Sequence, residues 1–424
     1  MLFARFWQNR DGGVAPFLAI AAVPLIGLTG AGIDYSRASA ARTAMQSALD
    51  ATALSLSKTA QGQTGEQIQG QAEQIFNAMF IRPEVENVSI QTNLSSPQQG
   101  SFVLNVSGSG TIKTYFAKVI GHSEMTFGSK SEVLWGIKKL NLALALDNTG
   151  SMSSSGKMTA LKTASHNLID TLKDAAKTPG DIKVSIVPFA VDVNAGTGNV
   201  AASWIDWEHW EAANGDCSKS SYHSKNSCNN NGGTWTPKDH SVWNGCVNDR
   251  DQNNDVMNTP AGSGASTKYR AHQASACPAA MMALSTDWSA MHTKIDAMTP
   301  SGNTNVTIGL QMAWQTLSNN EPFNAPAPSP DLDKVIILLT DGQNTQNRWT
   351  SSTSSIDDRT QKTCDNAKAA NIRIYTVRVI DGNGTLLQNC ATKPDMYYDV
   401  DQADELNGVF SSIAQNLANL RIAK

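Results

Sequence analysis

The sequence has few of the residues that usually hold soft transition metals, and it has no excess of positive charge. Its seven histidines are scattered along the chain, and its six cysteines include no CxxC pair. Both features argue against the common structural zinc sites. The formal net charge is −4 and no basic cluster or stacking motif occurs, so the sequence gives no support for a nucleic acid partner. The chemistry left for binding is that of carboxylate and hydroxyl oxygens.

The cysteines predict disulfides, because an even set in an exported domain usually pairs. Four of them lie between residues 204 and 280, a stretch rich in Asn, Gly, Ser and Trp that has no clear periodicity. We interpret this stretch as an insertion whose four cysteines form disulfides with one another. The alternative is that these four cysteines bind a zinc ion. Cys364 lies on a predicted helix and Cys390 in a loop after the next strand, and we expect these two residues to pair.

An uncharged, mostly apolar run of 20 residues extends from Val14 to Ile33. At about 1.5 Å per residue, a helix of this length just spans a hydrocarbon core of about 30 Å, so the run predicts a single membrane helix that is kinked at Pro24. A secretory signal peptide is the alternative, although its apolar core usually has only about 7–15 residues. Basic residues flank both ends of the run. The predicted disulfides therefore decide the orientation, with the region after the span outside the cytoplasm.

The remainder of the chain divides into regions that differ in the periodicity of their apolar residues. Residues 34–58 continue as an Ala-rich helical pattern, which is either a solvated stalk or a helix that packs against other membrane-rooted helices. Alternating residues then predict strands of a small α/β neck. Further on, strands alternate with helices, which is typical of a doubly wound, mainly parallel sheet covered on both faces. The expected domains are an anchor and stalk (1–60), the neck (61–138) and an α/β domain (139–424) with the insertion at about 204–280.

Two apolar runs of the α/β domain end in acidic loops. Residues 140–146 lead into Asp147-Asn148-Thr149-Gly150-Ser151, and residues 335–339 lead into Thr340-Asp341-Gly342. A third loop, Gly302-Asn303-Thr304, opens a helical pattern. Because the carboxyl ends of parallel strands meet at one sheet edge, which is where such domains bind ligands, we expect the loops to lie together. Oxygen ligands without cysteine or histidine suit a hard divalent cation.

These loops resemble the metal-ion-dependent adhesion site of von Willebrand factor A domains, which consists of Asp-x-Ser-x-Ser, a distant Thr and a distant Asp. Thr149 stands where that pattern has its first Ser, so a hydroxyl is retained. The resemblance implies a von Willebrand factor A-like fold and a Mg²⁺ ion, with Mn²⁺ or Ca²⁺ as substitutes. It also implies a free coordination position that accepts a carboxylate of a protein partner. The expected metal ligands, bound directly or through water, are Asp147, Thr149, Ser151, Thr304 and Asp341.

Other interpretations of the same loops remain open. The first loop is close to the Asp-Lys-Thr-Gly-Thr motif of phosphorylated cation pumps, which would make Asp147 the nucleophile of a phosphotransfer enzyme. That chemistry needs a cation beside the nucleophile and a second acid in the late loop, where this chain has Asn148 and Thr345. A structural turn is an adequate explanation for any single Asp-x-x-Gly. It explains less well why three such loops occur in the expected order.

The amino-terminal segments Arg10-Asp11-Gly12-Gly13, Gly32-Ile33-Asp34-Tyr35-Ser36-Arg37 and Ala48-Leu49-Asp50-Ala51-Thr52-Ala53-Leu54 look like those of bacterial Tad/Flp pilus-assembly proteins of the TadE/TadG kind. The Asp147 loop and Trp243-Asn244-Gly245-Cys246-Val247-Asn248-Asp249-Arg250 are similar to TadG-like members that carry an A domain. The resemblance implies a single-pass protein of the bacterial inner membrane with a periplasmic A domain. It implies no enzymatic activity, and partners among pilus-assembly or surface components of a thin adhesive pilus.

Overall fold

The computed structural model describes residues 15–60, 63–98, 101–136, 138–176 and 178–420. The chain forms two compact units, one within Met1–Gly136 and the other within Ile137–Ala423. Val14, the first residue of the predicted span, and the segment 10–13 lie outside the described residues.

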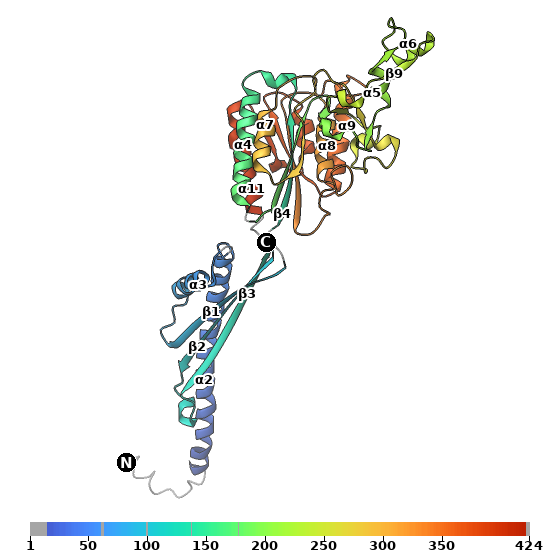
Figure 1. The fold of residues 1–424 in the computed structure, drawn as a ribbon. Helices are drawn as coiled ribbons and strands as arrows, with labels where there is room; N and C mark the ends of the chain where they lie inside the picture. Colours follow the sequence, from blue (N-terminus) through green and yellow to red (C-terminus); the bar gives the residue numbers. More distant parts are fainter. Residues whose placement is uncertain (1–14, 61–62, 99–100, 137, 177, 421–424) are drawn as a thin grey trace, which may run out of the picture. The chain divides into compact units, whose positions relative to one another are not determined.

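The amino-terminal unit combines one long helix with a three-stranded antiparallel sheet (Figure 1). Helix α2 runs without interruption through Pro24, and its segment from Phe17 onward is long and apolar enough to cross a membrane. A Thr64 capping box begins α3, where Thr64 and Gln67 satisfy each other's backbone N–H groups. The elements of this unit are α2 (Ala15–Ser57), α3 (Gly65–Met79), β1 (Val85–Gln98), β2 (Ser101–Lys113), the 3₁₀ helix η1 (Ala117–Ile120) and β3 (Glu124–Gly136).

The second half of α2 is not a solvated stalk, and its apolar stripe does not face other membrane-rooted helices. Its apolar residues Met45, Leu49 and Leu56 are fully buried, and they share one core with α3 and β2 of the same unit. The three-to-four spacing therefore marked a core-facing stripe, and the partner of that stripe is the neck sheet.

The carboxy-terminal unit is built on a mixed sheet with the order β15-β14-β13-β4-β5-β6-β10-β11-β7, and β12 also pairs with β5. The five strands from β15 to β5 are parallel, as the alternation of strands and helices predicted. The other pairings beside them are antiparallel except that of β11 with β7. The bounds of the parallel strands are β4 (Lys139–Asp147), β5 (Ile182–Phe189), β13 (Leu332–Thr340), β14 (Arg373–Val379) and β15 (Tyr397–Val400).

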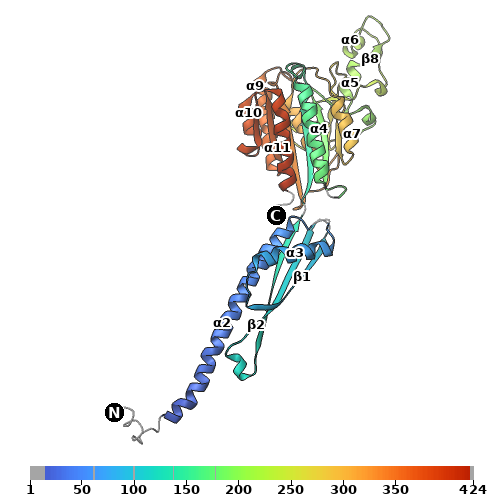
Figure 2. The same ribbon diagram turned by 90° about the vertical axis from the view of Figure 1, so that its left-hand side faces the viewer.

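Helices cover both faces of this sheet (Figures 1 and 2). Side chains on β4 alternate between the two layers, because successive residues of a strand point to opposite faces. Leu142 and Leu144 join the first core, whereas Ala143 and Ala145 join the second. The first layer comprises α4 (Lys157–Ala175), α7 (Trp288–Asp296) and α11 (Leu406–Leu420), and the second comprises α8 (Val306–Thr316), α9 (Thr353–Ala369) and α10 (Gly384–Cys390).

The insertion lies between β5 and α7, and its outer part projects from the unit as the arm labelled α5, α6 and β9 in Figure 1. Its elements are β6 (Val193–Asn194), β7 (Ile205–Asp206), α5 (Glu208–Ala213), β8 (Gly215–Cys217), α6 (Lys225–Asn230), β9 (Trp235–Pro237), β10 (Cys246–Asn248), β11 (Tyr269–Ala271) and β12 (Met282–Ser285). The 3₁₀ helices of this unit are η2 (Gly150–Ser153), η3 (Thr197–Asn199), η4 (His240–Val242), η5 (Asn254–Val256), η6 (Ala265–Thr267), η7 (Pro394–Met396) and η8 (Ala403–Glu405).

The predicted disulfides are confirmed. Cys217 pairs with Cys228 and Cys246 pairs with Cys277, so the four cysteines of the insertion bridge among themselves and do not hold zinc. The expected pair Cys364–Cys390 joins α9 to the last residue of α10.

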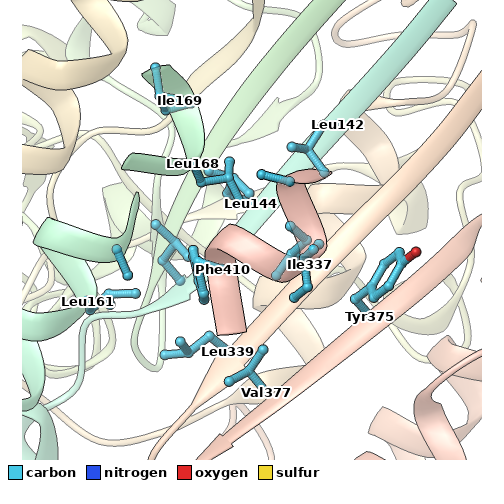
Figure 3. Packing of buried hydrophobic residues seen from close by; sticks show 14 of the residues in the cluster. Leu142, Leu144, Leu161, Leu168, Ile169, Ile337, Leu339, Tyr375, Val377 and Phe410 are labelled. Atoms are coloured by element: carbon cyan, nitrogen blue, oxygen red, sulfur yellow. The ribbon is translucent and has the colours of Figure 1, made fainter. Parts of the chain in front are cut away.

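Substitution of Phe410 tests how much the first core contributes to the stability of the protein. It lies on α11 and is fully buried among side chains from α4 and the sheet, including Leu161 and Leu339 (Figure 3). We expect Phe410→Ala to lower the free energy of unfolding by about 3–5 kcal/mol, because it removes buried apolar surface and leaves a cavity. Urea denaturation followed by tryptophan fluorescence measures this change. The exposed Gln415 on the same helix is the control, and an equal loss in Gln415→Ala would contradict the assignment.

Candidate metal centre

The parallel pairing of β4 with β13 determines the position of the candidate site. Leu146 is the register partner of Leu339, so Asp147 and Thr340 end neighbouring strands at the same edge, and Asp341 follows at once. On the other side, Asp147 is the register partner of Phe189 on β5. The two predicted acidic loops therefore begin side by side, although about 190 residues separate them in the sequence.

Asp147 is completely buried, and both of its carboxylate oxygens accept hydrogen bonds. Oδ1 accepts from the backbone N–H of Thr149 at 2.8 Å, and Oδ2 accepts from the Thr340 hydroxyl at 2.5 Å. Burial, followed by the nearby negative charge of Asp341, raises the pKa of Asp147 to about 6 despite these hydrogen bonds. The protein thus brings two carboxylates into one buried region, where a cation would relieve their repulsion.

Ser151 connects the first loop to the last. Its hydroxyl donates a hydrogen bond to Oδ1 of Asp341 at 2.6 Å and lies 3.0 Å from the hydroxyl of Thr149. Gly342 lies against this group, because a Cβ at that position would be 3.4 Å from Oγ of Ser151 and 3.6 Å from Oγ1 of Thr304. The hydroxyls of both residues therefore border the same small space.

The third loop is fixed between the other two. The backbone N–H of Gly150 donates to the carbonyl of Gly302 at 2.9 Å, which ties the first loop to the third. Thr304 exchanges two hydrogen bonds with Thr345, since its N–H donates to the Thr345 hydroxyl at 2.8 Å and its carbonyl accepts from the Thr345 N–H at 2.9 Å. All five residues expected from the sequence thus lie on three loops that contact one another.

Lys157 belongs to the same cluster and was not anticipated from the sequence. It is the first residue of α4, it is 3% exposed, and its ammonium lies 2.6 Å from Oδ2 of Asp341 and 3.8 Å from the exposed Asp381. No oxygen-ligand pattern includes a lysine, so a search for metal ligands does not reveal it. Its effect is to place one positive charge beside the two buried carboxylates.

Asp249 is a second residue whose part in the site was not anticipated. It lies in the insertion, directly after β10, and both of its oxygens accept hydrogen bonds from the side chain of Asn305, the residue that follows Thr304. The backbone N–H of Arg348 also donates to it at 3.2 Å. The insertion therefore supports the Thr304 loop. The one signal in the sequence was the family resemblance of the segment 243–250, which contains Asp249.

The donor set fits a hard divalent cation. It consists of two carboxylates and three hydroxyls, Asp147, Asp341, Thr149, Ser151 and Thr304. Within the described residues there is no cluster of three or more His, Cys, Asp or Glu side chains suited to a metal, so hydroxyls have to complete any shell at this edge. The exposed Ser151 and the neighbouring groove, 240 Å³ in volume and lined by Gly302, Asn303 and Gln346, leave this edge accessible to a partner.

Two family models match the sequence. Residues 12–56 match the family described as "Putative Flp pilus-assembly TadE/G-like", and residues 258–412 match the von Willebrand factor type A domain. The second match begins after the Asp147 loop and most of the insertion. The parallel sheet of this unit nevertheless includes earlier strands, because β4 pairs with β13 and β5 pairs with β4. Among curated protein sequences none matches this chain.

Several solved structures share a remote likeness. The pilus adhesin SpaC from Lactobacillus rhamnosus GG is 13% identical with a TM-score of 0.39, over 80% of this chain and 35% of that one. The vWF domain of the type V pili tip protein Mfa5 from Porphyromonas gingivalis is 12% identical with a TM-score of 0.40, over 68% and 97%. Proximal thread matrix protein 1 from the mussel byssus, with a zinc-occupied MIDAS motif, is 12% identical with a TM-score of 0.36, over 67% and 49%. This chain thus spans about a third of SpaC and half of the byssus protein.

The pH dependence of stability tests the support given by Asp249. Burial raises the pKa of Asp249 to about 7, although the hydrogen bonds from Asn305 and Arg348 favour the charged form. The folded protein therefore keeps this proton up to about pH 7, whereas the unfolded chain loses it near pH 4. The contribution of Asp249 to stability is complete below about pH 4 and is lost as the pH rises to about 7.

We expect the free energy of unfolding of the wild type, relative to Asp249→Asn, to fall over this pH range, as measured by urea denaturation at several pH values. The exposed Asp404→Asn variant should follow the wild type. A constant difference between the wild type and Asp249→Asn across the range would contradict the raised pKa.

Proposed function

We propose that the protein is a non-enzymatic, membrane-anchored adhesion or assembly protein of a Tad/Flp-type pilus system, which binds a protein partner through a divalent cation. The observation that carries this proposal is the hydrogen bond from Ser151 to Asp341, because it joins two loops of an oxygen-only donor set at the carboxyl edge of the sheet. The matches to a pilus-assembly family at residues 12–56 and to an A domain at residues 258–412 support the biological setting.

In this proposal Thr149, Ser151 and Thr304 bind Mg²⁺ through their hydroxyls, with Asp147 and Asp341 acting directly or through water. The cation would supply a Lewis-acid position for an incoming carboxylate of the partner. Hydrogen bonds from Thr149 and Thr340 fix the carboxylate of Asp147, so its orientation is set before any partner binds. The groove beside Gly302 and Asn303 offers further surface to that partner.

The proposed location is the bacterial inner membrane, with α2 crossing it once and the carboxy-terminal unit in the periplasm. Three disulfides support an oxidising compartment for that unit. The apolar part of α2, which is long and apolar enough to cross a membrane, supports the anchor. A tether of this kind raises the effective concentration of the binding edge at the membrane surface, where partners would assemble.

The phosphotransfer alternative receives less support. A nucleophilic carboxylate needs an oxygen that can reach a phosphoryl group. Both oxygens of Asp147 are instead buried and accept hydrogen bonds, and the neighbouring Asn148 uses its side-chain N–H to donate to the carbonyl of Thr299. The lysine of the cluster contacts Asp341, the acid of the other loop.

Metal affinity tests the site. We expect the full chain to bind Mg²⁺ or Mn²⁺ in calorimetry, and Asp147→Ala to abolish this binding. Thr304→Val, which keeps the shape of the side chain and replaces its hydroxyl with a methyl group, should weaken binding by about tenfold or more. Lys157→Met should tighten binding severalfold, because the lysine charge beside Asp341 opposes a second cation.

The matched control for the hydroxyl is Thr293→Val on the exposed face of α7, which should bind as the wild type does. Equal affinity in Asp147→Ala and the wild type would refute the proposed metal centre. An unchanged affinity in Lys157→Met would refute only the opposing role of the lysine.

Partner capture tests the function. We expect crosslinking in cells to join the wild type to pilus-assembly or surface components, and a chelator to reduce this capture. Asp341→Ala should lose the same components to a similar degree, because it removes the acid of the last loop. Cell adhesion and surface pilin provide the parallel readout. Full capture and adhesion in Asp341→Ala would show that the metal edge is not used, even if it binds a cation.

A further inference from the structure

The loop between β2 and β3 carries apolar residues on its outer surface. Residues 114–122 include η1, and in this loop Tyr115 is 66% exposed and Val119 is 85% exposed. The loop lies beside the apolar half of α2, some 80 residues away in the sequence (Figures 1 and 2). Exposed apolar side chains at the tip of a hairpin are unfavourable in water and suggest another environment.

Asp34 attaches this loop to α2. Its carboxylate is buried, and it accepts hydrogen bonds from three successive backbone N–H groups, those of Tyr115 at 2.9 Å, Phe116 at 2.9 Å and Ala117 at 2.8 Å. One turn earlier, Gly30 lies directly under Phe116, and a Cβ at this position would overlap the aromatic ring. Arg37 adds a hydrogen bond to the carbonyl of Lys113 at 3.2 Å and stacks over the Tyr115 ring.

Further backbone groups of the loop are paired locally. The N–H groups of Val119, Gly121 and His122 donate to carbonyls within the loop at 3.0–3.1 Å. Thr114 closes the base of the loop, since its N–H donates to Ser123 and its hydroxyl donates to the carbonyl of His122. Because these groups are already paired within the protein, taking them out of water costs less than it would for unpaired backbone groups.

The residues of α2 that the loop contacts indicate how deep the loop would lie in a bilayer. Phe116 and Val119 line an apolar groove of 570 Å³ together with Val23, Gly27 and Ala31 of α2. Val23 precedes Asp34 by 11 residues, which is roughly 16 Å of helix. The loop thus runs beside the carboxy-terminal part of the predicted span. If α2 crosses a bilayer there, the tip of the loop lies within the same apolar layer.

We propose that this loop is a membrane-inserted element, which enters the leaflet nearer Asp34 and contacts lipid acyl chains through Phe116, Val119 and the groove they form with α2. The proposal rests on the proposed membrane anchor. The occupant of the groove is an acyl chain, because its lining continues the exposed apolar surface of α2, on which Val23, Ile26 and Leu28 are 61–73% exposed. Lys118 can extend its ammonium toward the headgroups.

Depth-dependent quenching tests the proposal on the full chain reconstituted in phosphatidylcholine vesicles. Since all six cysteines are in disulfides, Val119→Cys provides one reactive thiol for an environment-sensitive NBD probe. Leu25→Cys on α2 is the lipid reference, and Ile81→Cys, which is 79% exposed in the same unit after α3, is the water reference. We expect the probe at residue 119 to be quenched by doxyl-labelled lipid and protected from iodide, as at residue 25.

A probe at residue 119 that behaves as at residue 81 would overturn the proposal, provided that residue 25 is quenched by lipid. Absence of lipid quenching at residue 25 would instead refute the anchor itself. If a second copy covers the groove, the probe at residue 119 will escape lipid quenching and respond to the ratio of protein to lipid, which would also overturn the proposal.

A glycine pair tests the attachment to α2. Gly30→Ala should displace Phe116 and reduce lipid quenching at residue 119, whereas Gly32→Ala should have no effect, because a Cβ on Gly32 meets nothing within 4 Å. Equal quenching in the two variants would overturn the docking of the loop on Gly30.

Discussion

The in-register parallel pairing of β4 with β13 is the constraint on which the candidate site depends. It makes two loops from distant parts of the sequence begin at adjacent points of one sheet edge. The hydrogen bonds from Thr340 to Asp147 and from Ser151 to Asp341 can form only in this register. A shift by one residue would turn the alternating Leu and Ala side chains of β4 to the wrong layers, so the cores on both faces stabilise the geometry of the site.

Much of this arrangement could be predicted because its signals are local. The apolar runs 140–146 and 335–339 lie within β4 and β13, and the acidic loops follow these buried strands, whose carboxyl ends share an edge. Lys157 and Asp249 could not be found in this way. Lys157 reaches Asp341 only after α4 packs on the sheet, and Asp249 reaches Asn305 only because the insertion folds back. Long-range packing of this kind leaves no periodic pattern in the local sequence, and only the family resemblance of the segment 243–250 pointed toward Asp249.

The stripe on α2 illustrates the same limit. A spacing of three or four residues indicates that one face of a helix is covered, and it does not indicate by what. Met45 and Leu49 pack on the neck of their own chain, so neither of the two environments considered for this segment applied. It was easier to predict that the four cysteines of the insertion bridge among themselves, because they lie in one irregular stretch, although their individual pairs were not predicted.

The continuity of α2 has a mechanical consequence. From Leu25 to Ser57 the helix extends for about 50 Å at 1.5 Å per residue, and its later turns are bonded to the neck sheet along one side. Such a rod acts as a stiff lever. A tilt of about 10° at the bilayer would displace its far end by roughly 9 Å over that length. With α2 as the proposed membrane anchor, force or rearrangement within the membrane would be transmitted to the neck as a rotation.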